Sequence, residues 1–162
     1  MEIRRVTTDG RRVSIGWRER VDLPEWGLKS VRAKIDTGAR TSAIDVANIE
    51  HLDNGKIRFE VVAKLRPKRK TRWIEATPVR VSNVKSSNGE LQERIVCKTM
   101  LRIGHHEQQI ELSLVCRKQM LCRMLVGRLA IADRFLVDPG EKYILTNRSK
   151  PANDDLTPRG SR

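Results

Sequence analysis

The segment Ile35-Asp36-Thr37-Gly38-Ala39 contains the residue types best suited to chemistry in this sequence. It places a carboxylate at the end of an alternating apolar stretch, immediately before two turn residues. Gly38 allows a close backbone approach that a side chain would obstruct, and the Thr37 hydroxyl can hydrogen-bond to a neighbouring copy of the same loop. The pattern predicts a rigid loop that presents the Asp36 carboxylate.

A lone carboxylate, with an ordinary pKa of about 4, is a poor general acid and a weak base at neutral pH. Two carboxylates held together share one proton, so that one activates water while the other hydrogen-bonds to the amide oxygen. The chain contains one Asp-Thr-Gly, so the second carboxylate must come from another subunit across a two-fold axis. We therefore expect Asp36, Thr37 and Gly38 to form the catalytic loop of a homodimeric peptide hydrolase.

The elements that must position this loop are mostly strands. Apolar residues alternate with polar ones in residues 29–35, in residues 56–62 after an Asn-Gly turn, and in residues 95–103 and 110–114, which are typical of a hairpin. Only residues 127–134 have apolar spacing closer to a helix. The expected fold is all-β with one short C-terminal helix.

A second motif follows about ninety residues after the first, where the apolar stretch Met124-Leu125-Val126 runs into Gly127-Arg128. Together, Asp36-Thr37-Gly38-Ala39 and this apolar Gly-Arg stretch resemble the pattern of retroviral-type aspartic proteases. The longer strings at residues 34–43, 125–128 and 135–139 resemble a narrower bacterial family, often labelled ATP-dependent zinc proteases. That family includes RimB, which is associated with ribosomal-protein glutamylation.

This resemblance, which covers roughly residues 14–146, implies a retropepsin-like closed β-barrel, the acid-protease fold, over residues 1–146. It also implies a dimeric site with Asp36 from each subunit and a flap hairpin over the cleft. Turn chemistry places the flap at residues 79–99, with Asn88-Gly89 near its tip. For members similar to RimB the expected reaction is hydrolysis of poly-α-glutamate or a related acidic peptide or glutamylated protein.

The charge balance favours an acidic partner independently. The chain has 33 Lys and Arg against 20 Asp and Glu, a formal charge of +13, and such a field attracts polyanions. We expect Lys34, Ala39 and Arg40 beside the turn, and Arg80 and Arg94 in the flap, to bind substrate. Gly127 and Arg128 are expected to be structural supports, with Asp45 as one candidate ion-pair partner of Arg128.

Structural and non-catalytic interpretations of the same residues also stay open. Asp, Thr and Gly are common in ordinary turns, and the basic run at residues 64–72 is expected to be an exposed loop that is either solvated or used for ribosome or RNA association. The alternative function is a non-catalytic basic module of the same fold that holds RNA or an acidic protein. Aromatic residues are only 4% of the chain and do not alternate with cations, which weakens the nucleic-acid alternative. A structural barrel that accompanies ligase partners is a third hypothesis.

The zinc and ATP terms of the family label find no motif in this sequence. There is no HExxH, the three histidines and the Cys116/Cys122 pair lack metal-ligand spacing, and no glycine-rich phosphate loop is present. We therefore expect no metal and no cofactor.

An odd number of cysteines, Cys97, Cys116 and Cys122, favours a cytoplasmic location with the thiols as small core residues. No apolar run approaches the roughly 18 residues of a membrane span, so no membrane association is expected. Residues 147–162 have a composition typical of a disordered tail.

Overall fold

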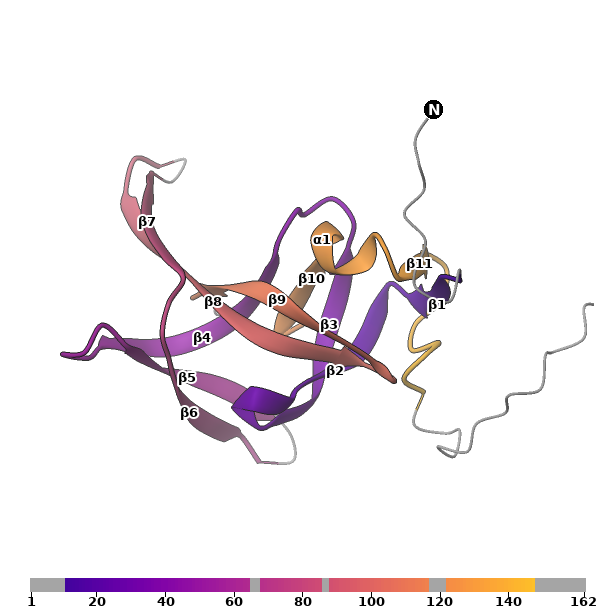
Figure 1. The fold of residues 1–162 in the computed structure, drawn as a ribbon, viewed down its shortest axis with the longest axis horizontal. Coiled ribbons are helices and arrows are strands. Elements are labelled where there is room, and N and C mark those ends of the chain that lie inside the picture. Colours follow the sequence, from indigo (N-terminus) through magenta and orange to yellow (C-terminus); the bar gives the residue numbers. More distant parts are fainter. Residues whose placement is uncertain (1–10, 65–67, 86–87, 117–121, 148–162) are drawn as a thin grey trace, which may run out of the picture.

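The computed structural model describes residues 11–64, 68–85, 88–116 and 122–147 (Figure 1). Strands dominate, and their bounds are β1 Val13–Gly16, β2 Arg18–Leu23, β3 Leu28–Asp36, β4 Ser42–His51, β5 Ile57–Lys64, β6 Lys70–Ala76, β7 Arg80–Lys85, β8 Leu91–Ile103, β9 His106–Val115, β10 Met124–Gly127 and β11 Phe135–Asp138. A 3-10 turn, η1, covers Pro24–Trp26, and the single α-helical turn of the described residues, α1, covers Arg128–Ile131.

Six strands close into a mixed barrel. Their order is β10-β3-β2-β8-β9-β4, and β4 returns to pair with β10. The apolar side of each alternating stretch faces the core: Val31, Ala33 and Ile35 of β3 are all buried. The expected mostly β fold with a closed barrel and one short helix is confirmed, although the helix is shorter than the predicted residues 127–134.

The two expected hairpins are present. The β4 and β5 strands are joined by a turn in which Gly55 has a φ of 78°, a backbone conformation that favours glycine. The β8 and β9 strands pair from Ile95 and Leu114 to Ile103 and His106, around a turn whose Gly104 also has a positive φ. Period-two alternation and turn chemistry therefore located β5, β8 and β9, whereas β4 was not predicted.

The basic run at residues 64–72 is not simply a loop, as the sequence suggested. Its first residue, Lys64, ends β5, and its last three residues begin β6, which pairs with β5 in an antiparallel hairpin. The exposure expected for the run is found at residues 68–72, and residues 65–67 lie outside the described residues. The charged side chains are tolerated in a strand because they lie at the solvent-exposed end of the hairpin.

The cysteines differ from one another in their surroundings. Cys97 and Cys122 are buried, as expected of small core residues, whereas Cys116 is exposed directly after β9 ends. The expectation for Cys116 was wrong because the alternating pattern of β9 ends one residue earlier, at Val115. No helix of the described part of the chain is long and apolar enough to cross a membrane, and the predicted tail lies outside the described residues from residue 148 onward.

A buried carboxylate ties the C-terminal segment to the barrel. Glu19 is fully buried in β2. Its Oε1 accepts hydrogen bonds from the backbone N–H groups of Gly16 and Leu145 at 3.1 and 3.0 Å, and its Oε2 accepts from the backbone N–H and the hydroxyl of Thr146 at 3.0 and 2.6 Å. Because these four donors come from two distant segments, Glu19 holds residues 145–146 against the start of the chain.

The variant Glu19→Gln should lower the free energy of unfolding by about 2–4 kcal/mol, because an amide nitrogen would replace one acceptor and face buried donors. Urea denaturation followed by circular dichroism measures the change. The matched control Glu141→Gln, at an exposed position, should change stability by less than about 0.5 kcal/mol. Equal stability of the two variants would contradict the assigned role of Glu19.

Candidate active site

The Asp36 loop joins two strands that are neighbours in the chain but not in the sheet. The β10 strand lies between β3 and β4, parallel to the first and antiparallel to the second (Figure 1). In this register Gly127, at the end of β10, is the partner of Asp36 at the end of β3. The two sequence motifs, about ninety residues apart, are therefore brought side by side.

The turn itself orients the Asp36 carboxylate. Its Oδ1 accepts hydrogen bonds from the backbone N–H groups of Gly38 and Ala39 at 3.0 and 3.2 Å, and the Ala39 N–H also lies 3.3 Å from the Asp36 carbonyl oxygen. Asp36 is half-buried, while Thr37 and Gly38 are exposed. The loop thus fixes the carboxylate through one oxygen and presents its own tip to solvent.

The strand β10 and helix α1 hold the other side of the loop. The buried N–H of Gly127 donates to the Ser42 hydroxyl at 3.0 Å, and the N–H groups of Arg128 and Leu129 donate to the carbonyl oxygens of Ala39 and Arg40 at 2.7 and 3.1 Å. Sequence reasoning missed Ser42, although its place at the start of the next strand could have drawn attention to it.

Gly127 is required by space. A Cβ atom at this position would lie 2.5 Å from both the carbonyl carbon and the oxygen of Thr41, a distance that real Cβ contacts do not reach. Because the obstacle is backbone, it cannot move aside as a flexible side chain would. Glycine therefore lets β10 approach the end of the Asp36 loop.

Arg128 supports the loop in a different way from the expected ion pair. Its Nη1 donates to the Thr37 carbonyl oxygen at 3.0 Å. Asp45, the candidate partner, is buried and instead accepts a hydrogen bond from Arg123 Nη1 at 3.0 Å. Asp45 was one candidate partner of Arg128, and the alternative was that it is merely exposed; it is buried and hydrogen-bonded to Arg123, while Arg128 donates to the turn.

The cations expected to bind substrate lie in different settings. Lys34 and Arg40 are exposed on either side of the turn, with Ala39 half-buried between Gly38 and Arg40. Arg94 is exposed on β8, opposite Ser82 of β7. Arg80 was expected to be available to a bound chain but forms a bidentate ion pair with Glu111 of β9, at 3.0 and 2.7 Å.

The hairpin predicted to be the flap is present. The β7 and β8 strands pair from Arg80 and Val96 outward to Lys85 and Leu91, and the hairpin projects from the barrel (Figure 1). Residues 86–87 of its tip lie outside the described residues. Val81 and Leu91 expose 51% and 75% of their surface, which leaves apolar side chains on this hairpin without cover.

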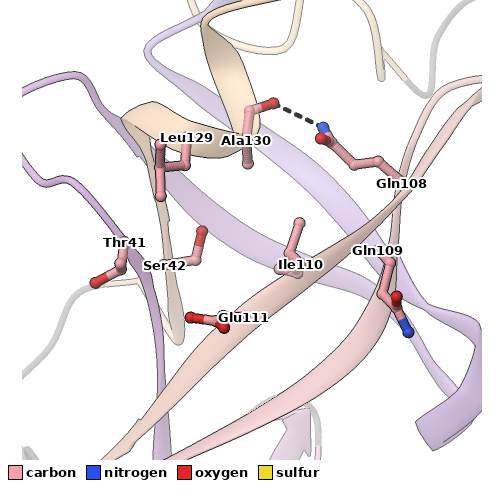
Figure 2. Close-up of a pocket in the computed structure, with 8 residues that line it drawn as sticks. All are labelled: Thr41, Ser42, Gln108, Gln109, Ile110, Glu111, Leu129 and Ala130. Carbon is pink, nitrogen blue, oxygen red and sulfur yellow. Dashed lines mark hydrogen bonds between the residues drawn. The ribbon is translucent and has the colours of Figure 1, made fainter.

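A pocket of about 220 Å³ begins where the Asp36 loop ends (Figure 2). It is lined by Thr41, Ser42, Gln108, Gln109, Ile110, Glu111, Leu129 and Ala130. The Gln108 amide donates to the Ala130 carbonyl oxygen at 2.7 Å and joins β9 to α1 across the pocket. The pocket therefore lies between the end of the Asp36 loop, the barrel strand β9 and helix α1.

The described residues contain no group of three or more His, Cys, Asp or Glu side chains placed to hold a metal ion. Burial also raises the pKa of the Cys97 thiol to about 11, so this thiol is protonated at neutral pH and is a poor ligand. A resident zinc ion of the kind that the family label implies has no ligand set in this part of the chain.

A closed mixed barrel that carries an Asp-Thr-Gly turn beside an apolar Gly-Arg strand is typical of a retropepsin-like domain. The sequence model of the RimB-like family, described as retropepsin-like aspartic endopeptidase RimB, matches residues 14–148. The chain belongs to this family, as its two motifs indicated.

Similar proteins include two described as probable alpha-L-glutamate ligases. The one from Shewanella halifaxensis is 36% identical over 135 residues, which cover 81% of this chain and 29% of the relative. The one from Desulfotalea psychrophila is 36% identical over 140 residues, covering 84% and 30%. The chain thus spans less than a third of the length of these relatives.

A crystal structure of a Legionella pneumophila protein of unknown function has a TM-score of 0.68 at 27% identity, covering 83% of this chain and 99% of that one.

The variant Gly127→Ala should lower the free energy of unfolding by about 1–3 kcal/mol, because the added methyl group forces β10 away from the Thr41 backbone. Chemical denaturation measures the loss. Proton and nitrogen chemical shifts of residues 37–42 should change with it, since α1 and the loop share hydrogen bonds. A variant with unchanged stability and unchanged shifts would show that the close approach is not required.

Proposed function

We propose that this chain is one subunit of an aspartic peptidase whose catalytic unit is a pair of Asp36 carboxylates, one from each of two copies. The observation that carries the proposal is the Asp36 carboxylate, fixed by Gly38 and Ala39 at an exposed turn that Gly127 and Arg128 brace from behind. Exposed Thr37 and Gly38 leave the tip of the loop accessible to a second copy.

The reaction follows from two carboxyl groups that share one proton. The ionised member takes a proton from water as the water oxygen attacks the carbonyl carbon of the peptide, and the protonated member donates a hydrogen bond to the carbonyl oxygen. The tetrahedral intermediate collapses when the carboxyl group that took the proton from water passes it to the leaving nitrogen and the carbon–nitrogen bond breaks. The Arg128 hydrogen bond to the Thr37 carbonyl oxygen positions the loop throughout.

An acidic peptide, of the poly-α-glutamate type, is the substrate class that we infer. The surplus of Lys and Arg gives the chain a formal charge of +13, and a glutamate chain carries a negative charge on every residue. The relatives described as alpha-L-glutamate ligases contain a matching segment within a much longer chain. A hydrolase that acts on glutamate peptides would complement ligase chemistry on the same material.

One surface favours a second function, a basic module that holds RNA. On the β5–β6 hairpin the Arg58 guanidinium lies 4.4 Å from the ring centroid of Trp73, which is 40% exposed, and the strand of Trp73 carries the exposed cations Lys70 and Arg72 on its other face. An exposed aromatic ring that contacts a guanidinium suits single-stranded nucleic acid. Strongly salt-dependent RNA binding that survives loss of Asp36, without any peptide cleavage, would favour this function over the first.

Replacing Asp36 by Asn should reduce cleavage of poly-α-glutamate at least about a hundredfold, because the pair then lacks the carboxylates that move protons. Release of new amino groups measures turnover. The control Asp53→Asn, which removes the same charge from an exposed turn, should retain activity, and EDTA should leave the wild-type rate unchanged. Full activity of the Asp36 variant would eliminate the mechanism.

The specific activity should fall on dilution, in proportion to the fraction of dimer, because each site needs a carboxylate from two copies. A dilution series of the wild-type protein, combined with sedimentation velocity at the same concentrations, measures both quantities. A constant specific activity from a protein that sediments as a monomer would refute the shared site.

A further inference from the structure

A cluster of charged side chains lies at the pocket beside the Asp36 loop. Glu111 lines this pocket together with Thr41 and Ser42, which directly follow the loop (Figure 2). The Glu111 carboxylate accepts hydrogen bonds from both terminal nitrogens of Arg80, at 3.0 and 2.7 Å. This pair joins the first residue of the flap hairpin to the pocket wall.

Two further cations surround the same carboxylate. Lys98 is the direct partner of Glu111 across the β8–β9 ladder, and Arg80 pairs with Val96, two residues before Lys98, so all three charged side chains share one face of the sheet. The Arg80 hydrogen bonds lower the pKa of Glu111, and the charges of Lys98 and Arg40 lower it further. Arg80 and Lys98 thus lie on the face of Glu111, and Arg40 directly precedes Thr41 in the wall of the same pocket.

The remaining positive charge is accessible. The side chains of Arg80 and Glu111 are 56% and 34% exposed, so solvent screens their ion pair and it contributes little to stability. A guanidinium has five N–H donors, so Arg80 keeps donors beyond the two that bind Glu111. Arg40 and Lys98 are also exposed.

The opposite end of the same strands has the reverse charge balance. Arg102 of β8 lies 3.4 Å from Asp22 and 3.2 Å from Glu107, so two carboxylates contact one guanidinium. Arg102 therefore has two carboxylate partners, whereas Arg80 and Lys98 lie beside one carboxylate, Glu111.

We propose that Arg40, Arg80 and Lys98 form a subsite that binds an acidic side chain of a peptide extending from the Asp36 loop along the pocket. The inference rests on the proposed peptidase function and adds a specificity determinant to it. Glu111 holds the Arg80 guanidinium at the pocket wall, while Arg40 and Lys98 supply the uncompensated charge. A neutral chain of the same length gains none of these contacts.

The test measures binding without turnover. In the Asp36→Asn protein, fluorescence anisotropy records the affinity for a labelled hexa-α-glutamate peptide and for a hexaglutamine control. Arg40→Gln and Arg80→Gln should each weaken binding of the glutamate peptide about tenfold, because each removes a partner of a substrate carboxylate. The matched control Arg102→Gln, with the same loss of charge on β8, should weaken it less than about twofold, since its partners already neutralise it.

Melting curves establish that each variant folds, and Arg80→Lys, which keeps the charge, should retain most of the affinity. Equal losses in all three glutamine variants, no loss in any of them, or no measurable binding of the glutamate peptide would each overturn the subsite. Cleavage by the protein with Asp36 intact is assayed in parallel. If the protein cleaves the peptide but Arg40→Gln and Arg80→Gln do not weaken binding selectively, the subsite is refuted and the peptidase function stands. If binding is weakened selectively but no cleavage occurs, the subsite stands and the peptidase function is refuted.

Discussion

The pairing of β10 with both β3 and β4 is the constraint on which the rest of the structure depends. Two strands that follow each other in the chain would normally pair directly through a tight turn. Here a strand from about ninety residues later separates them, so their connection must pass over the end of β10. That connection is the Asp36 loop, and Gly127 makes the passage sterically feasible because it has no side chain to meet the Thr41 backbone.

The position of β10 between β3 and β4 also explains how the Asp36 loop can be held by many hydrogen bonds and still be exposed. Its inner side is held by Ser42 and by the first N–H groups of α1, and its own backbone holds the carboxylate. Its outer side, with Thr37 and Gly38, contacts solvent. The proposed pairing of two carboxylates would need both properties, since a mobile loop would add an entropy cost to each encounter.

Local patterns in the sequence predicted four of the six barrel strands, β3, β8, β9 and β10, and glycine turns predicted two hairpins, whereas β2 and β4 were not predicted. The motif pair also indicated the family, because Asp36-Thr37-Gly38 and Gly127-Arg128 are each short and contiguous. What could not be predicted depends on contacts between distant segments. The pairing of Asp45 with Arg123, the buried Glu19 that binds Thr146, and the Ser42 hydroxyl beneath Gly127 all join residues 78 to 127 positions apart. The strand β6 was missed for a different reason. It has a single buried residue, Ile74, and its cations leave no apolar alternation to recognise.

The net charge of the chain and the location of its charges carry different information about a partner. A formal charge of +13 indicates an acidic partner but gives no location for it. Two arginines on neighbouring strands of one sheet differ in the charges around them. Arg102 contacts two carboxylates, whereas Arg80 contacts one, Glu111, whose pKa is also lowered by the charges of Lys98 and Arg40. Because Coulombic interactions weaken with distance and with salt, the cations that still lack a partner determine where an anion binds. In the described residues the cluster around Glu111 combines such cations with a pocket and with the end of the Asp36 loop, so chemistry and selectivity would arise from one side of the barrel.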